Sequence, residues 1–317
     1  MIIDIAIIIL GLAILIVGGE FLVKGAVGIA AKAHLSTLVI GMTVVSFGTS
    51  APELLVSLKA AYLDMPEIAI GNVIGSNIAN IALVLGLTVI IFPMPVSRNS
   101  IRFDWPMMFI SGILFLLFSL NLMIGRIEGA ILFTLLILFL YFIISNSRKK
   151  SKQQLKREFT TSDVQQPILK VNIWKSLLFL LLGLVGLYFG ARWLVVGAKS
   201  LGENIGLSKH VIAITVVAFG TSVPELVTSV VAAYRKQMDI SVGNLIGSNI
   251  FNIMAVIGIT SMVHPIEIES EVVRWDMIWM LAIFIALLPM MLFKRKIGRI
   301  SGVILLVTYV VYIVTLF

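Results

Sequence analysis

The chain has 317 residues, of which 59% are hydrophobic and 13% charged, and its mean hydropathy is +1.09. A soluble domain has about 45–50% apolar and about 25% charged residues, so this composition excludes an ordinary soluble enzyme. It also excludes a disordered chain, which needs low hydrophobicity. With no cysteine and three histidines, the chain is poorly supplied for thiolate chemistry or a histidine-based metal site. The net charge of +8 does not by itself indicate nucleic acid, because in a membrane protein the distribution of charge matters more.

Ten stretches of the sequence are long and apolar enough to cross a membrane, which takes about 20 residues. The first has no basic region before it and no cleavage site, so we expect it to remain as a helix. In chain order the ranges are 3–27, 38–62, 69–92, 105–123, 128–146, 173–198, 210–234, 241–263, 275–293 and 300–316. The sequence therefore predicts an all-α integral membrane protein with ten transmembrane helices.

A polar segment, residues 147–170, follows the fifth span and is predicted to be a linker between residues 1–146 and 171–317. If the N-terminus lies outside, 18 of the 24 Lys and Arg residues fall on the cytoplasmic side, eight of them between Arg148 and Lys175. The positive-inside rule then predicts a multi-pass protein of the inner (plasma) membrane with both termini outside and a cytoplasmic linker. Contact of the basic run with lipid headgroups is the alternative interpretation.

The sequence contains an internal repeat at an offset of 172 residues. Residues 41–58 match residues 213–230 at eleven of eighteen positions, and residues 71–81 match residues 243–253 at nine of eleven. Each half holds five predicted spans, and because five is odd, the second half enters the membrane from the opposite side. The result is two inverted five-helix repeats, an arrangement typical of secondary transporters. A structural repeat without transport is the alternative.

Two acidic residues, Glu53 and Glu225, occupy equivalent positions near the centres of the second and seventh spans. A lone charge at the bilayer centre costs at least about 2.5–3.5 kcal/mol, and no Lys or Arg lies mid-span to compensate it. A bound cation would do so, and a protonated, hydrogen-bonded carboxyl is the alternative. Pro52 and Pro224 each free a carbonyl four residues earlier, so we expect a break in both helices. Unwound carbonyls at membrane depth can coordinate ions.

The third and eighth spans add a polar stripe. Asn72, Ser76 and Asn80 are spaced four apart, which places them on one helix face, and the second half repeats the pattern. All candidate ligands are oxygens, which suit hard cations such as Ca²⁺ or Na⁺, and two carboxylates neutralise one Ca²⁺. A different role, in hydrogen bonds between packed helices, is expected for Asn72, Asn77, Asn244 and Asn249.

At these residues the sequence resembles the sodium/calcium exchanger family, through GTSAPE with GNVIGSNIANI and GTSVPE with GNLIGSNIFNI. The resemblance implies four ion sites clustered at the centre of the ten helices. Glu53 and Glu225 would be the main Ca²⁺ ligands, joined by main-chain oxygens of Thr49 and Thr221. The residues that would shape the flanking Na⁺ sites are Ser50, Ser76, Ser222, Ser248, Asn80 and Asn252.

The resemblance implies a secondary active antiporter, not an enzyme, that exchanges Na⁺ for Ca²⁺ and extrudes Ca²⁺. Its partners would be these ions and the lipid bilayer, with no cofactor, no nucleic acid and a functional monomer. Relatives that carry Asp at a position matching Asn80 or Asn252 are linked to K⁺ co-transport. Because both positions are Asn here, we expect transport that is indifferent to K⁺.

Three other functions remain open from the residues alone. A Ca²⁺/H⁺ exchanger would use the same two glutamates to trade protons for Ca²⁺. A passive cation channel would conduct without a counter-ion. An intramembrane hydrolase acting through Ser50 or Ser222 lacks a mid-membrane His or Lys as base.

The first and sixth spans are rich in glycine, and the family resemblance implies that they slide across the rest of the bundle. Near the end of the first span, Glu20 has Lys24 four residues later as its expected ion-pair partner. The three histidines are expected to lie at span ends or in loops.

Overall fold

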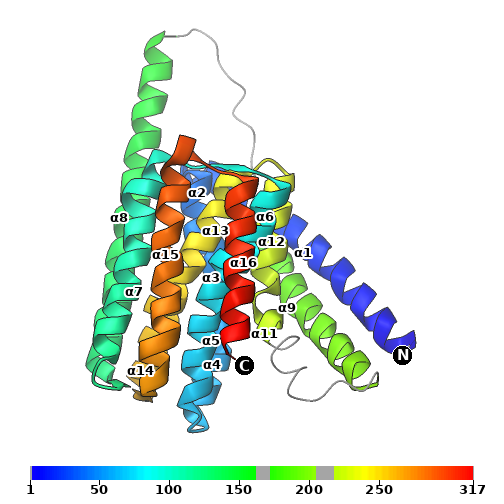
Figure 1. Cartoon of the computed structure of the whole chain (residues 1–317). Coiled ribbons are helices and arrows are strands. Elements are labelled where there is room, and N and C mark those ends of the chain that lie inside the picture. Colours follow the sequence, from blue (N-terminus) through cyan, green and yellow to red (C-terminus); the bar gives the residue numbers. More distant parts are fainter. Residues whose placement is uncertain (1, 162–171, 205–217, 317) are drawn as a thin grey trace.

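The computed structural model describes residues 2–161, 172–204 and 218–316, without the side chains of residues 151–161. The described chain is a bundle of long helices beside which two tilted helices, α1 and α9, lie next to each other (Figure 1). Such helices follow from the sequence, because long apolar segments in lipid must satisfy every backbone group within the segment.

The helices of the first half are interrupted rather than continuous. Three of them contain a π-helical stretch, in which the backbone hydrogen bonds join residues five apart instead of four. In chain order the elements are α1 (Ile2–Ala33), α2 (Thr37–Ile40), η1 (Gly41–Val45), α3 (Ser46–Thr49), α4 (Ala51–Tyr62), α5 (Pro66–Ile78), η2 (Ala79–Leu85), α6 (Gly86–Ile91), β1 (Met94–Pro95), η3 (Ser100–Asp104), α7 (Trp105–Ser119), β2 (Met123–Ile124) and α8 (Arg126–Thr161).

The second half follows the same plan in its described part. Two π-helical stretches recur at equivalent places, within the eighth and before the ninth predicted span. The elements are α9 (Ile173–Asn204), α11 (Ala218–Thr221), α12 (Val223–Tyr234), α13 (Met238–Phe251), η5 (Asn252–Ile257), α14 (Gly258–Val263), β3 (Ile266–Glu267), η6 (Val272–Asp276), α15 (Met277–Leu292), η7 (Phe293–Arg295), β4 (Lys296–Ile297) and α16 (Arg299–Thr315).

Seven helices in the described chain are long and apolar enough to cross a membrane, or eight if the bent pair Thr37–Thr49 and Ala51–Tyr62 forms one span. Two more apolar helices, Val223–Tyr234 and Arg299–Thr315, are shorter. The prediction of a helical multi-pass protein is confirmed, whereas this count does not confirm ten spans. Part of the predicted seventh span, residues 210–217, lies outside the described residues. The predicted linker, 147–170, begins as helix, since α8 continues to Thr161.

Two short antiparallel strand pairs join the halves. Met94 in β1 pairs with Ile297 in β4, and Met123 in β2 pairs with Glu267 in β3. β1 and β3 are equivalent in the sequence repeat, because Met94 and Ile266 are 172 residues apart. Each half therefore contributes its two strands to two different pairs, the exchange expected of elements related by a two-fold axis.

Two turns with an uncommon backbone conformation also recur at the 172-residue offset. Asp64 and Lys236, 172 residues apart, both adopt a positive φ, of 54° and 59°, in the turn after the broken helix. Leu122 and Lys294, at the same offset, have φ values of 63° and 52°. A non-glycine residue with positive φ is uncommon, and these two turns have it at equivalent positions of both halves.

Glycines bring α1 and α9 into backbone contact. A Cβ added at Gly18 would lie 2.8 Å from the backbone nitrogen of Leu187, and one at Gly190 would lie 2.9 Å from that of Leu15. Real Cβ atoms are not found that close to a backbone, so only glycine permits this separation. The glycine-rich faces of the two helices are thus directed toward each other, and a smaller apolar cluster of α1, η1, α9 and α12 side chains joins the pair to the bundle.

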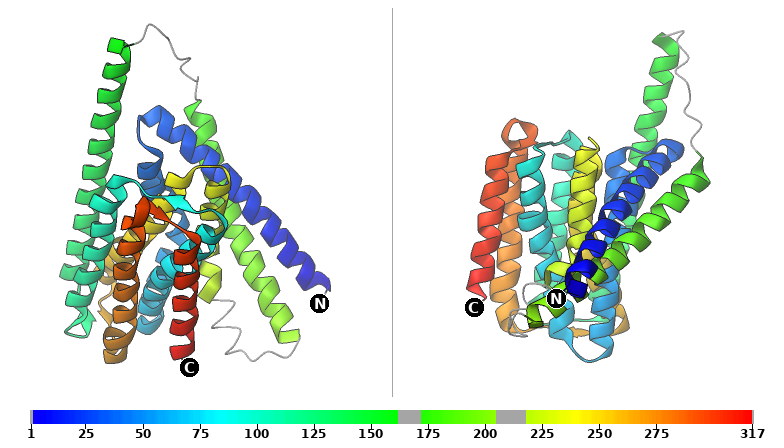
Figure 2. Two further views of the ribbon diagram at one scale, coloured as in Figure 1. Left: turned by 45° about the horizontal axis from the view of Figure 1, so that its top comes forward. Right: turned by 90° about the vertical axis from the view of Figure 1, so that its right-hand side faces the viewer.

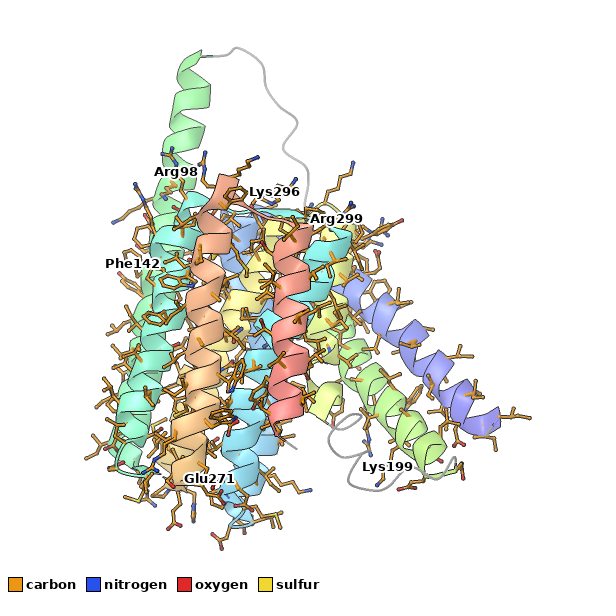
Figure 3. All side chains as sticks on the ribbon, in the orientation of Figure 1. Arg98, Phe142, Lys199, Glu271, Lys296 and Arg299 are labelled. Carbon is orange, nitrogen blue, oxygen red and sulfur yellow. The ribbon has the colours of Figure 1, made fainter. Side chains whose placement is uncertain are left out.

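Charged residues lie at both ends of the molecule. Figure 3 shows Arg98, Lys296 and Arg299 at the end where α8 projects, and Glu271 and Lys199 at the opposite end. Both chain termini lie toward that second end in Figures 1 and 2. The main apolar core, between these ends, packs α5–α8 against α13–α16.

Candidate functional site

The second predicted span breaks where the sequence predicts. α3 ends at Thr49 and α4 begins at Ala51, with a bend of 42° between them. The residue at the break, Ser50, has φ −87° and ψ 2°, and its equivalent, Ser222, has φ −88° and ψ 0°. Each break precedes a proline in the first turn of the next helix, where its missing N–H costs nothing. The predicted helix breaks are therefore confirmed in both halves.

The break sets each glutamate in the first turn of a new helix. Glu53 is the third residue of α4 and Glu225 the third of α12, and both side chains are fully buried. The N-terminus of a helix carries a partial positive charge, which favours a carboxylate there. The broken helices thus provide partial compensation for two buried negative charges.

The two halves interlock around these glutamates. α4, which carries Glu53, contacts η5 of the other half, and α12, which carries Glu225, contacts η2. Asn80 lies in η2 and Asn252 begins η5, and both are fully buried. The helix that carries each glutamate therefore packs against the π-helical segment that carries the asparagine of the other repeat. Both glutamates and both asparagines thus lie in one central region.

Hydrogen bonds across the repeat interface connect the break to the eighth predicted span and to Glu225. Thr49 Oγ1 donates to Asn244 Oδ1 over 3.2 Å and lies 3.4 Å from Ser248 Oγ. Ser50 Oγ donates to Glu225 Oε1 over 3.5 Å, a long bond. These contacts place the Ser50 hydroxyl beside the α12 carboxylate and connect the end of α3 to α13.

Several buried polar atoms at this centre have no hydrogen-bond partner within the described part of the chain. They include both carboxylate oxygens of Glu53 and Oε2 of Glu225. Buried polar groups are normally satisfied, and a concentration of exceptions calls for an explanation such as an ion. The other atoms in this set are Ser222 Oγ and the side-chain oxygens and nitrogens of Asn80 and Asn252. Ser76, also predicted to be at the site, is 4% exposed.

Asn72 and its equivalent Asn244 hold neighbouring helices together. Asn72 Nδ2 donates to Ser57 Oγ over 3.0 Å, and Asn244 Nδ2 donates to Ser229 Oγ over 3.3 Å. These bonds agree with the predicted packing role, although Asn244 also accepts from Thr49. The sequence analysis did not single out Ser57 and Ser229, and their matching offset of 172 is the signal that could have identified them.

The glycines of α13 pack against a neighbouring helix, whereas, among the described residues, the equivalent glycines of α5 do not. A Cβ at Gly243 would lie 2.5 Å from the carbonyl oxygen of Leu38, and one at Gly247 would lie 2.8 Å from Met42 Cα, so α13 packs closely on α2 and η1. A Cβ added at Gly71 or Gly75 would meet no described atom of another segment within 4 Å. The segment equivalent to α2 and η1 is residues 209–217, which lie outside the described residues.

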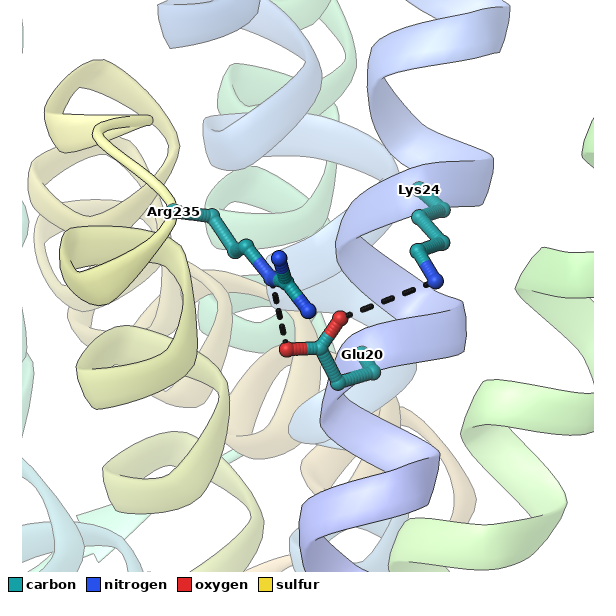
Figure 4. Close-up of polar contacts among 3 residues, drawn as sticks. All are labelled: Glu20, Lys24 and Arg235. Carbon is teal, nitrogen blue, oxygen red and sulfur yellow. Dashed lines mark hydrogen bonds and ion pairs between the residues drawn. The ribbon is translucent and has the colours of Figure 1, made fainter.

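An ion pair connects α1 to the end of α12. Arg235 Nε lies 2.7 Å from Glu20 Oε1, while Lys24 Nζ lies 3.8 Å from Glu20 Oε2 (Figure 4). The Lys24 contact is the predicted one, and the shorter Arg235 contact is one that the sequence analysis missed. The bond to the Glu20 carboxylate raises the pKa of Arg235 above its usual value, so the guanidinium keeps its charge.

The donor set is chemically restricted. The described residues contain no group of three or more His, Cys, Asp and Glu side chains able to hold a metal. What the centre offers is two carboxylates among hydroxyl, amide and main-chain oxygens. Such a set of oxygen ligands suits a hard cation, and it offers nothing to soft metals.

Comparison with known proteins agrees with this chemistry. The family model described as "Sodium/calcium exchanger protein" matches residues 3–145 and 175–317. The chain is 34% identical over 313 residues to "Putative antiporter CaxA" of Alkalimonas amylolytica, covering 98% of this chain and 97% of that protein. It is 31% identical to "Sodium/calcium exchanger MaX1" of Methanosarcina acetivorans, covering 98% and 97%. A solved structure of the sodium-calcium exchanger NCX_Mj superposes with a TM-score of 0.84 at 34% identity, covering 100% of this chain and 99% of the other.

Proposed function

We propose, because the chain belongs to the sodium/calcium exchanger family, that it exchanges Na⁺ for Ca²⁺ across the membrane by alternating access and normally extrudes Ca²⁺. Membership of the family and the match to NCX_Mj support antiport of a cation against Ca²⁺. What we propose beyond this is that Na⁺ is the coupling ion and that Ca²⁺ is transported out of the cell.

The observation that carries this proposal is the pair of fully buried carboxylates with unpartnered oxygens, Glu53 and Glu225, at equivalent helix breaks. Within the described residues no Lys, Arg or His forms an ion pair with either one. An isolated buried charge is costly, so the pair favours a bound cation. Two carboxylates match the charge of one Ca²⁺.

The surrounding neutral oxygens provide places for Na⁺. We assign Ca²⁺ to the two glutamates with main-chain oxygens of Thr49 and Thr221. If Na⁺ and Ca²⁺ compete for these carboxylates, either loaded form can cross while the empty, doubly charged form crosses poorly. That difference makes transport an obligatory exchange. The flanking Na⁺ sites are assigned to Ser50, Ser76, Ser222, Ser248, Asn80 and Asn252.

The proposed framework is ten transmembrane helices in two inverted repeats, residues 1–146 and 171–317, joined by a cytoplasmic linker. The strand exchange between β1, β2, β3 and β4 and the recurring turns support a two-fold relation. The basic end that carries Arg98 and Arg299 supports a cytoplasmic assignment for that face, with both termini outside (Figure 3). We propose a monomer of the plasma membrane that needs no cofactor.

The test is ⁴⁵Ca²⁺ uptake into vesicles containing the purified full-length chain. With Na⁺ inside and none outside, we expect rapid uptake that stops when the Na⁺ gradient is removed. A proton gradient alone should drive none. Uptake driven by pH and indifferent to Na⁺ would assign the protein as a Ca²⁺/H⁺ exchanger instead, and flux without any counter-ion would indicate a channel.

Substitutions of the two buried glutamates test whether transport depends on the proposed site. Glu53→Gln and Glu225→Gln keep the side-chain volume but remove the charge, so each should abolish exchange. The matched control is Glu67→Gln, in the first turn of α5 but exposed, which should retain it. Exchange that survives at either buried position would overturn the assignment of that glutamate.

A further inference from the structure

A cavity with both polar and apolar lining lies away from the central site, between the start of α2, η3 and α8. It has a volume of about 240 Å³. Ser36, which caps α2, donates its backbone N–H to Ser147 Oγ of α8 over 2.9 Å, so the cavity wall is fixed by a bond between two elements far apart in sequence. Asn99, Asp104 and Lys150 supply its other polar groups.

Asp104 is a buried acid that the proposed transport does not use. Its side chain is 3% exposed, it lines the cavity, and Oδ2 has no hydrogen-bond partner among the described residues. It forms no ion pair in that part of the chain. The Ser100 side chain hydrogen-bonds this carboxyl, but no positive charge within the described ranges offsets it. A buried charge without an opposite charge is costly, which favours a positively charged group in the cavity.

The acid equivalent to Asp104 in the second repeat has a hydrogen-bond partner that Asp104 lacks. Asp276, which is equivalent to Asp104, accepts a hydrogen bond from the hydroxyl of Tyr312 over 2.9 Å. The residue equivalent to Tyr312 in the first repeat is Leu140, which has no hydroxyl. Asp104 therefore lacks the partner from another helix that Asp276 has, and it lines a cavity instead.

The chemistry of the cavity indicates a zwitterion. One carboxylate is too little for a divalent cation, and the volume far exceeds that of a bare ion. Lys150, on another part of the wall, places Nζ 3.1 Å from Asn99 Oδ1 and contributes a positive charge. An ammonium group at Asp104 and a phosphate at Lys150 would satisfy both.

The position of the cavity favours a lipid as the source of that ligand. Asp104 lies four residues into the apolar segment Ser100–Ser119, or roughly 6 Å along a helix, a depth suited to a headgroup. Phe103 and Phe142 line the cavity with rings 5.6 Å apart and are 38% and 47% exposed, which offers apolar surface to acyl chains. Phe142 lies near the end of the bundle that carries Arg98 (Figure 3).

We propose that this cavity binds the headgroup of a zwitterionic phospholipid with a primary ammonium, the ammonium on Asp104 and the phosphate on Lys150. A primary ammonium donates three hydrogen bonds, whereas the quaternary ammonium of a choline lipid donates none. The cavity should therefore discriminate between the two headgroups. This assignment is independent of the transported ion.

The test is native mass spectrometry of the full-length chain extracted from vesicles with equal amounts of phosphatidylethanolamine and phosphatidylcholine. We expect about tenfold preferential retention of the ethanolamine lipid, the gain typical of one charge-assisted hydrogen bond. Asp104→Asn should abolish the preference, while the matched control Asp276→Asn should keep it. Equal retention by the wild type, or a preference that survives in Asp104→Asn, would overturn the proposal.

Two further measurements test the role of Lys150 and whether the ligand is a lipid. Lys150→Gln, on an exposed residue that cannot disturb the core, should weaken retention of both lipids without changing their ratio. An unchanged retention would remove Lys150 from the site and overturn the zwitterion assignment. Soluble phosphoethanolamine, added to protein in phosphatidylcholine vesicles, should not compete at millimolar concentration. If soluble phosphoethanolamine raises the melting temperature and phosphatidylethanolamine does not, the cavity binds a soluble ligand and the lipid proposal is overturned.

Discussion

Arg235, at the end of α12, donates a hydrogen bond from Nε to Glu20 Oε1 over 2.7 Å, and so ties the tilted helix α1 to the helix that carries Glu225 (Figure 4). The two side chains are 49% and 19% exposed. The position equivalent to Arg235 in the first repeat is Leu63, so this ion pair has no counterpart there. The ion pair thus ties α1 to the core, whereas α9 has no such pair at the equivalent positions, Arg192 and Leu63.

The first prediction concerns this ion pair. If α1 and α9 slide during transport, as the family resemblance implies, the pair must break at each cycle. Arg235→Gln should then raise the initial rate of Na⁺-driven Ca²⁺ uptake about twofold, because exposed pairs are weak. The melting temperature should hardly change. Both are measured on the same vesicle preparation.

The control for this prediction is Lys24→Gln, which removes only the 3.8 Å contact and should leave the rate unchanged. Glu20→Gln should behave like Arg235→Gln, and the double variant should behave like either single one. Additive effects of the two substitutions would show that the residues act separately, and the pair would then have no role in the cycle.

The sequence predicts the local features of the site well. Pro52 and Pro224 break their helices because a proline cannot complete the helical hydrogen bonds, and this depends only on neighbouring residues. The equivalence of Glu53 and Glu225 follows from the repeat. The family resemblance is confirmed by the matches to both halves. These inferences need no knowledge of how the two repeats meet.

Contacts between the repeats could not be predicted in the same way. Thr49 bonds to Asn244 at a separation of 195 residues, and Glu20 bonds to Arg235 at a separation of 215. Such pairs depend on the angle and register at which the repeats pack. The π-helical stretches, such as the one that ends at Asp104, also have no simple sequence signal, since they use the same residue types as α-helices.

The second prediction is indifference to K⁺. Asn80 and Asn252 are fully buried and uncharged, so the centre carries two negative charges. Replacing external K⁺ by choline should leave Na⁺-driven ⁴⁵Ca²⁺ uptake unchanged. Asn80→Asp adds a third carboxylate, which needs one more cation, and should make uptake depend on K⁺ or on pH. Asn80→Ser is the uncharged control. A K⁺ requirement in the wild type would contradict this account of the charge.

The third prediction concerns the α1–α9 contact. In Gly25→Ala the new Cβ would meet the backbone nitrogen of Leu180 at 2.5 Å and the carbonyl oxygen of Ser176 at 2.7 Å. Neither backbone can move without separating the helices, so we expect a loss of stability of about 1–3 kcal/mol. The measurement is the thermal unfolding midpoint in detergent.

A matched control for Gly25→Ala lies on the same helix. Ala13→Val also adds apolar volume to α1, but on an exposed face, and should leave the unfolding midpoint unchanged. Equal effects of the two substitutions would mean that any enlargement of α1 is destabilising, and the close contact with α9 would not be the cause.

The fourth prediction is that removing Ca²⁺ destabilises the protein. A ligand that binds only the folded state adds about 2.7 kcal/mol at a hundred times its dissociation constant. Chelating Ca²⁺ in Na⁺-free buffer should therefore lower the unfolding midpoint, because Glu53 and Glu225 then lose the cation that offsets their burial. Saturating Na⁺ should restore part of it. The double variant Glu53→Gln/Glu225→Gln has no charge left to compensate, so its midpoint should be the same with and without Ca²⁺. A Ca²⁺-dependent shift that persists in the double variant would place the ion elsewhere.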